Sequence, residues 1–218
     1  MDADLRIRAG RWTDKDAVAA VIADALHPTE LGAWLVPDPG QRRRVLADVL
    51  AIWIEHAMFF GDIYLTHDLT AAAVGFHRYR PIPLPANYGI RLTDAAGEHA
   101  GRFTLLDHVL SAQRPTEPHY HLAFLAVTPT AQHAGCGRAL LAHHRSRVDR
   151  IDLPSWTDTT ADVHDLYARY GYIARPPIAL PDGPRIHPMR RNPPPSSNAW
   201  PQAAAPPTST AHSPDHVI

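Results

Sequence analysis

The stretch LAVTPTAQHAGCGRALL, residues 125–141, joins an apolar run to a helical pattern through a turn that contains glycine. The apolar run is typical of a buried strand, and Pro129 ends it because proline has no backbone N–H to give to a sheet. From Gly135 onward, apolar residues return at the spacing of an amphipathic helix. The first N–H groups of a helix have no partner within it, and the helix dipole is positive at that end. Residues 125–141 therefore predict a strand, an anion-binding turn and a helix, in that order.

The glycines of this turn favour a diphosphate as the anion. Gly135 and Gly137 lack the Cβ atoms that would hold a diphosphate away from the backbone, and Gln132 and Arg138 can add side-chain donors. An ordinary strand–turn–helix connection has the same outline, so the glycines alone leave that alternative open. The dinucleotide fingerprint G-x-G-x-x-G is incomplete because Leu140 stands at the third glycine position, and no G-K-[ST] of a P-loop is present.

On both sides of this turn, the hydrophobic pattern predicts alternating strands and helices. A helix that Thr13 or Asp14 can cap follows the first strand, and residues 80–87 carry three prolines that predict a loop. Strands are expected at 5–8, 63–66, 71–79, 119–127, 154–157, 172–175 and 185–189, and further helices at 41–57, 103–110, 135–148 and 163–170.

Composition excludes several classes of protein. The chain has 218 residues, of which 45% are hydrophobic, and its formal net charge is -1, so it can build a core and lacks the basic surface of a nucleic-acid binder. Cys136 is the only cysteine, and the spacing of the 15 histidines does not match known zinc patterns, so neither a disulfide nor a metal site is expected. Because the start is acidic and no apolar run approaches roughly 20 residues, we expect a soluble, cytoplasmic protein without a membrane partner.

The C-terminal segment differs in composition from the rest of the chain. Residues 192–218 are rich in proline and poor in large apolar side chains. Such a sequence cannot bury enough apolar surface to order itself. We predict one domain over residues 1–191 and a disordered tail over 192–218, whose removal should leave the melting temperature nearly unchanged.

Two motifs together resemble a known family. V-x-P-x-x-Q-x-x-G-x-G-R-A-L-L, residues 127–141, resembles the acetyl-CoA-binding motif of the GNAT superfamily of N-acetyltransferases, and L-Y-A-R-Y-G-Y, residues 166–172, resembles the second signature of that family. The strand at 119–127 is similar to that of the branch of antibiotic-modifying, puromycin-type acetyltransferases. The resemblance implies the GNAT fold of the α/β (α+β) class, with a mixed, mostly antiparallel sheet of about six to seven strands and about four helices.

The same resemblance implies where the coenzyme binds. Acetyl-CoA is the expected co-substrate, and its acetyl group would pass directly to a primary amine of a small molecule within a ternary complex. The pantetheine arm would lie along the strand at Leu125, Ala126 and Val127. The diphosphate would bind the turn formed by Gln132, His133, Ala134, Gly135, Cys136, Gly137 and Arg138.

For catalysis, Tyr167 matches the acid that protonates the departing thiolate in the family. A phenol with a pKa near 10 is mostly protonated at pH 7. The base stays open between Asp158, His121, a water-relayed base and none. Where relatives of the antibiotic-modifying branch often carry a Glu on the fifth strand, and an Asn four residues before the tyrosine, this chain has Thr157 and Val163.

Three functions remain open from the sequence. The first is the small-molecule N-acetyltransferase, acting as a monomer or homodimer. The second is acetylation of a protein N-terminus or lysine, and the third is a domain that binds CoA without turnover, which the residues at 157 and 163 would fit. The aromatic segments 34–37 and 53–60 are predicted either to line the acceptor site or to belong to the core.

Overall fold

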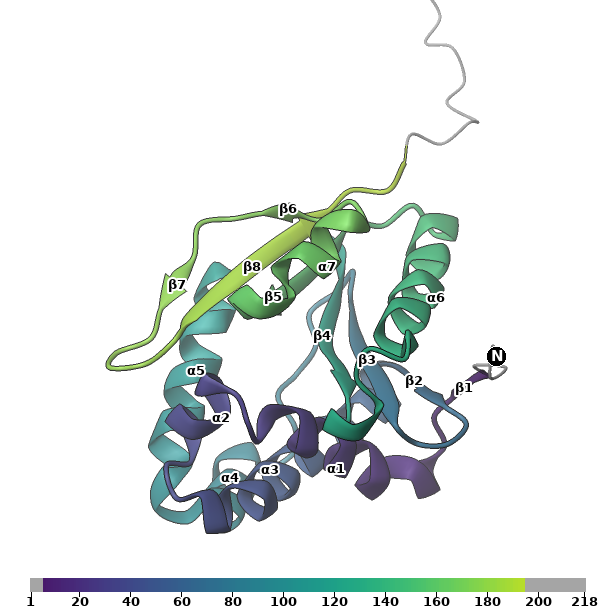
Figure 1. The fold of residues 1–218 in the computed structure, drawn as a ribbon. Helices are drawn as coiled ribbons and strands as arrows, with labels where there is room; N and C mark the ends of the chain where they lie inside the picture. Colours follow the sequence, from purple (N-terminus) through teal and green to yellow (C-terminus); the bar gives the residue numbers. More distant parts are fainter. Residues whose placement is uncertain (1–5, 195–218) are drawn as a thin grey trace, which may run out of the picture.

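A mixed β-sheet forms the centre of the protein in the computed structural model, which describes residues 6–194 (Figure 1). The strand order is β1-β2-β3-β4-β5-β8-β6, and β7 pairs with β8. Every neighbouring pair is antiparallel except β4 and β5, which run parallel. The strands are β1 Ile7–Ala9, β2 Gly61–Thr66, β3 Ala71–Arg78, β4 His119–Val127, β5 Ser155–Thr159, β6 Ile173–Ala174, β7 Ile178–Ala179 and β8 Arg185–Arg191.

Helices cover both faces of this sheet. α1 and α3 contact β2, β3 and β4 on one face, whereas α6 contacts the same three strands on the other (Figure 1). The helices are α1 Lys15–Leu26, α2 Glu30–Leu35, α3 Pro39–Phe60, α4 Tyr88–Ala96, α5 Ala100–Gln113, α6 Cys136–Arg150 and α7 His164–Arg169. Residues 6–194 thus hold seven α-helices rather than about four. α2 and α4 lie in segments where the sequence predicted no helix.

The element bounds follow from local signals. β4 has the predicted bounds, and α3 extends the predicted helix at both ends. Asp38 caps α3 by accepting a hydrogen bond from the Gly40 N–H, and Pro39 takes the first helical position, where its missing donor costs nothing. At the start of α1, the Asp14 carboxylate instead accepts bonds from Arg8 and from the Arg11 backbone, so its side chain caps no helical N–H.

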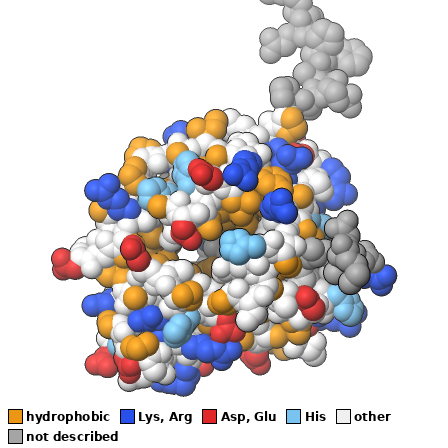
Figure 2. Space-filling model, in the orientation of Figure 1, with side chains coloured by type: hydrophobic (Ala, Val, Ile, Leu, Met, Phe, Trp, Pro, Cys, Tyr) orange, Lys and Arg blue, Asp and Glu red, His pale blue; other side chains and the backbone are white. Residues whose placement is uncertain are grey.

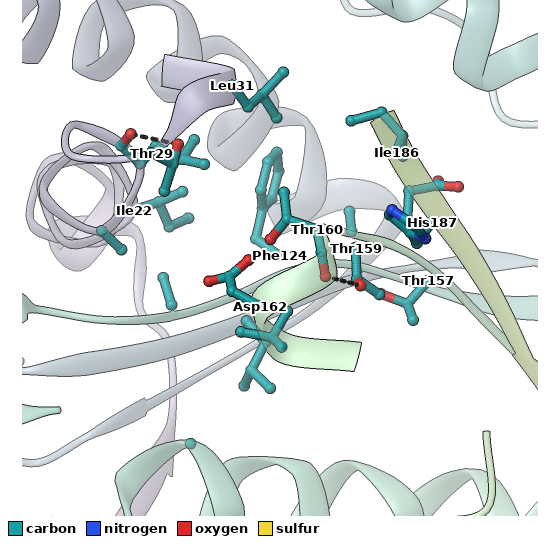
Figure 3. A pocket seen from close by; sticks show the side chains of 18 of the residues that line it. Ile22, Thr29, Leu31, Phe124, Thr157, Thr159, Thr160, Asp162, Ile186 and His187 are labelled. Atoms are coloured by element: carbon teal, nitrogen blue, oxygen red, sulfur yellow. Dashed lines mark hydrogen bonds between the residues drawn. The ribbon is translucent and has the colours of Figure 1, made fainter. Parts of the chain in front are cut away.

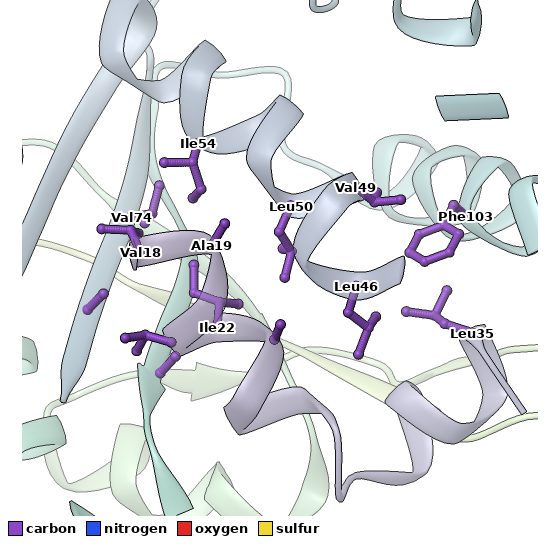
Figure 4. Close-up of a cluster of buried hydrophobic side chains, with 14 of the residues drawn as sticks. Val18, Ala19, Ile22, Leu35, Leu46, Val49, Leu50, Ile54, Val74 and Phe103 are labelled. Carbon is purple, nitrogen blue, oxygen red and sulfur yellow. The ribbon is translucent and has the colours of Figure 1, made fainter. Parts of the chain in front are cut away.

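Two apolar clusters hold these layers together. The first lies under α1, α3 and α5 (Figure 4), and the second lies under α6 and α7. β3 serves both, because alternate residues of a strand point to opposite faces. Ala72, Val74 and Phe76 belong to the first cluster, whereas Ala71 and Ala73 belong to the second.

A β-bulge interrupts the same alternation in β4. Val74 and Gly75, neighbours on β3, pair with Phe124 and Leu122, so Ala123 is an extra residue on β4. Ala123 and Phe124 consequently both pack against the first cluster, and the strand beyond them is turned. The bulge lies where β4 separates from β5, which positions the site described below.

Part of the predicted organisation lies outside the described residues. Residues 195–218, most of the proposed C-terminal tail, belong to that part of the chain, as do residues 1–5. Asn192, Pro193 and Pro194, which are described, form neither helix nor strand. Among residues 6–194, no helix combines the length and the apolar character needed to cross a membrane.

Candidate functional site

A cavity of about 1300 Å³ opens between the separated ends of β4 and β5. Figure 2 shows this face of the molecule hollowed near its centre, with hydrophobic side chains visible in the opening. Every predicted site residue except Ala134 lines the cavity. In Figure 3, Ile22, Thr29 and Leu31 of the α1–α2 region face Thr157 on β5 and His187 on β8 across the cavity, with Phe124 between them.

One edge of β4 is unpaired inside this cavity. β4 pairs with β5 only at Tyr120, His121 and Leu122, and no β5 residue pairs with residues 123–127. The strand therefore presents peptide groups along Leu125, Ala126 and Val127 that β5 leaves unbonded. An extended ligand with amide groups can bond to such an edge in the manner of an added strand.

The predicted anion-binding turn follows directly on this edge. A 3-10 turn, Pro129–Ala131, leads to Gln132, and Gly135 then precedes α6 with a φ of 91°. No side chain among the described residues caps the first turn of α6, so its N–H groups are available to an anion. A Cβ on Gly137 would lie 3.4 Å from Val127 Cγ2, at van der Waals contact, so α6 begins close against β4.

Tyr167 lies on α7 with its side chain in the second cluster. Its ring makes an edge contact with Tyr172, with 5.3 Å between the centroids, and the residue also lines the cavity. Burial raises the pKa of Tyr167 to about 12, although a hydrogen bond with Thr157 acts in the opposite direction. The phenol therefore keeps its proton at neutral pH.

His121 and Asp158 form a buried pair. His121 Nε2 lies 3.2 Å from Asp158 Oδ2, and Asp158 Oδ1 accepts a hydrogen bond from the Trp156 indole. Burial lowers the pKa of His121 to about 4, and the hydrogen bond to Asp158 only partly offsets this effect. Neutral His121 donates its Nε2–H to Asp158, which leaves Nδ1 as the acceptor nitrogen. That Nδ1 is buried and has no hydrogen-bond partner among the described residues.

Thr157 lies on the fifth strand beside Tyr167. Thr157 is buried on β5, opposite Leu122 of β4 and Met189 of β8, and bonds to the hydroxyl of Tyr167. It therefore holds the tyrosine and cannot serve as a carboxylate base. Val163 ends the short turn before α7 and lines the cavity with an apolar side chain.

Sequence reasoning missed several charged residues of the cavity, among them Asp107, Arg78 and Arg114. Asp107 lies on α5 and accepts a hydrogen bond from the hydroxyl of Tyr88. Burial raises the pKa of Asp107 to about 6. In the sequence, only the acidic residue within the apolar run of residues 105–110 could have indicated Asp107 as a site residue. No sequence feature indicated Arg78 or Arg114, because only the fold brings β3 and α5 together.

The two aromatic segments divide between the predicted roles. Trp53 lines the cavity and contacts Tyr88 edge-on, with 5.1 Å between the ring centroids. Trp34 belongs to the first apolar cluster, and its indole N–H donates to the carbonyl of Pro181 over 2.9 Å. Trp53 therefore lines the cavity, as does Leu35 of the other segment, whereas Trp34 is a core residue.

No family model matches the chain, but solved structures share its architecture. A histone acetyltransferase and related acetyltransferase from Corynebacterium glutamicum aligns with a TM-score of 0.65 and 24% identity, covering 86% of this chain and 95% of that one. Arylalkylamine N-acetyltransferase 2 from Aedes aegypti aligns with a TM-score of 0.58 and 13% identity over 87% and 99%. The ribosomal-protein-S18-alanine N-acetyltransferase of Escherichia coli aligns with a TM-score of 0.52 and 14% identity over 89% and 98%. The protein therefore has the GNAT fold, as the two sequence motifs predict.

Proposed function

We propose that the protein is an N-acetyltransferase that moves the acetyl group of acetyl-CoA onto a primary amine of a small molecule. One observation carries the proposal. The unpaired edge of β4 leads directly into the uncapped first turn of α6, and both line the cavity that holds Tyr167 and the His121–Asp158 pair. The fold shared with acetyltransferases agrees with this reading.

Each part of the coenzyme has a matching part of the cavity. The pantetheine amides would bond to the backbone at Leu125, Ala126 and Val127. The diphosphate would bind the amides of residues 132–138, with the Arg138 side chain as an added cation. Several amides that converge on one diphosphate supply roughly 1.5–3 kcal/mol for each hydrogen bond to a charged group.

The reaction needs one group that accepts the proton of the amine and one group that stabilises the departing thiolate. The amine nitrogen attacks the thioester carbon, the C–S bond breaks, and the proton lost by nitrogen passes to Nδ1 of His121, which Asp158 orients. The nitrogen is strongly acidic once it has bonded to the carbonyl carbon, so an imidazole of low pKa can accept its proton. Because the pKa of Tyr167 lies above that of a thiol, Tyr167 serves by donating a hydrogen bond to the sulfur as negative charge develops there.

The cavity favours a small molecule over a protein as the acceptor. Its acceptor side is enclosed by apolar side chains of α1, α3 and α5, among them Leu46, Leu50 and Leu106. Membership of the puromycin-type branch rests on residues 119–127 alone and stays a prediction. Cytoplasmic location and a monomeric or homodimeric state also stay predictions.

Binding and turnover are tested separately. Saturating acetyl-CoA, at 100 times its Kd, should raise the free energy of unfolding by about 2.7 kcal/mol, measured by thermal denaturation. Thiol release with a panel of primary amines then tests acetyl transfer. Absence of any binding of acetyl-CoA or CoA by calorimetry would defeat the proposal, and binding without thiol release would leave a CoA-binding domain that lacks turnover.

A further inference from the structure

Two arginines lie at the acceptor end of the cavity. Arg78 is the last residue of β3, and Arg114 follows α5 directly. They are the two residues that line both the main cavity and a second, smaller cavity of about 320 Å³. Because Phe76 pairs with His121 and Arg78 with His119 across the strands, these side chains lie on one face of the sheet, the face of the first apolar cluster.

The charges of these two arginines are not paired within the part of the chain that the structure describes. Neither forms an ion pair with any described residue, and the Nε of each is buried without a hydrogen-bond partner. Other partly buried arginines are paired: Arg191 binds Asp149 through two bonds of 2.6 and 2.9 Å, and Arg147 binds Asp62 at 3.0 Å. A buried charge without a partner is costly, so the Arg78–Arg114 pair points to an anion from outside the chain.

The environment of the pair supports the same reading. Burial and the charge of Arg114 lower the pKa of Arg78 to about 10, so both guanidinium groups still carry their charge at pH 7. Asp107 and Asp158 attract Arg114 at a distance, but their oxygens accept hydrogen bonds from Tyr88, His121 and Trp156 instead. The guanidinium donors of Arg78 and Arg114 therefore remain for a ligand.

We propose that the acceptor is an amino acid with an apolar side chain, whose carboxylate binds Arg78 and Arg114 while its amine faces His121. The inference rests on the proposed acetyl transfer and names its substrate class. The charges of Arg78 and Arg114 both lower the pKa of His121. The carboxylate and the amine of such a substrate would therefore lie within one electrostatic environment. Phe76, whose ring lies 5.6 Å from the Arg78 guanidinium carbon, and Trp53 line the cavity for the apolar side chain.

The kinetic test compares amines that differ only in the carboxylate. L-Phenylalanine is compared with 2-phenylethylamine, and kcat/KM is measured for both in the wild type and in Arg78→Gln, Arg114→Gln and Arg80→Gln. The wild type should prefer L-phenylalanine by roughly tenfold or more, since a hydrogen bond to a charged group supplies that much discrimination. The preference should disappear in Arg78→Gln and Arg114→Gln through a higher KM for L-phenylalanine. It should persist in Arg80→Gln, which removes an exposed charge that does not line the main cavity.

A binding test needs no turnover. 3-Phenylpropanoate, a carboxylate without an amine, should bind the wild type and Arg80→Gln in calorimetry, and should bind Arg78→Gln at least tenfold more weakly. Thermal melts of each variant check that the fold is kept. An equal or better kcat/KM for 2-phenylethylamine in the wild type, or equal binding of the carboxylate by Arg78→Gln, would overturn this inference alone. Failure of every amine to release thiol would overturn the proposed function instead.

Discussion

At the scale of single residues, Tyr167 links β5 with the second apolar cluster. Its hydroxyl bonds to Thr157 of β5, and its ring packs against Tyr172 in the second apolar cluster. We expect Tyr167→Phe to lower kcat at least tenfold, because one hydrogen bond to a developing charge is worth roughly that factor or more. The Kd for acetyl-CoA, measured by calorimetry, should change little, since the ring remains. Wild-type turnover in this variant would remove Tyr167 from the mechanism.

The His121–Asp158 pair makes a second residue-scale prediction. Asp158 raises the pKa of His121, although the lowering effect of burial is stronger. Asp158→Asn should therefore lower that pKa further and leave the orientation of the imidazole less fixed. We expect kcat/KM to fall by roughly tenfold or more in Asp158→Asn and in His121→Ala, within the range measured for general base catalysis. The measurement is the dependence of kcat/KM on pH. Profiles that match the wild type in height and shape in both variants would favour a water-relayed base.

At the scale of elements, the bulge in β4 and the turn before α6 act together. The bulge turns β4 at Ala123, and pairing with β5 ends at the preceding residue, Leu122. A regular β4 would put Leu122 and Ala126 on one face, whereas they pack in different clusters. The bulge thus sets which side chains and peptide groups of β4 face the cavity.

Gly135 is the position where this element is most open to test. Its φ of 91° lies in the left-handed region, so alanine there shifts the turn in the free protein, and restoring the present conformation on binding costs about 1–2 kcal/mol. We expect Gly135→Ala to weaken acetyl-CoA and CoA binding by a similar factor, roughly 5- to 30-fold. Gly101→Ala is the matched control, because Gly101 lies within α5 and an added Cβ meets nothing within 4 Å. Unchanged affinity in Gly135→Ala, measured by calorimetry, would argue against diphosphate binding at this turn.

At the scale of the whole molecule, buried histidines link stability to pH. Burial lowers the pKa of His121 to about 4 and that of His144 to about 3, against an unfolded value of about 6.5. Between these values the unfolded chain binds more protons, so the free energy of unfolding should fall as the pH drops from about 6.5 toward 4, by a few kcal/mol in order of magnitude. Asp107, with its pKa raised to about 6, opposes this trend with a smaller shift.

Thermal denaturation as a function of pH tests this linkage. The melting temperature of the wild type should decrease steadily from pH 6.5 to 4.5. His144→Gln should show a shallower decrease, since His144 is buried among Ser155 and Tyr172 and lies outside the proposed site. His67→Asn, which changes an exposed residue, is the control and should follow the wild type. A flat wild-type profile, or equal slopes in wild type and His144→Gln, would contradict the prediction.

Residue pattern alone determined the elements around the turn before α6. The apolar run at 119–127, Pro129 and the glycines at 135 and 137 are local signals, because strand, turn and helix propensities depend on neighbouring residues. Two such motifs in one chain were enough to predict the GNAT fold, and β4 has the bounds that its sequence predicts. α2 and α4 were not predicted from the sequence.

Tertiary structure alone decided the environment of the site. The low pKa of His121 and the raised pKa values of Tyr167 and Asp107 come from burial by elements far apart in the chain, which no local pattern contains. The β4 bulge depends on pairing with β3, and the Arg78–Arg114 pair exists because α5 packs over the end of that strand. Short stretches of residues determine local chemistry, whereas desolvation and charge pairing depend on which distant segments the fold brings together.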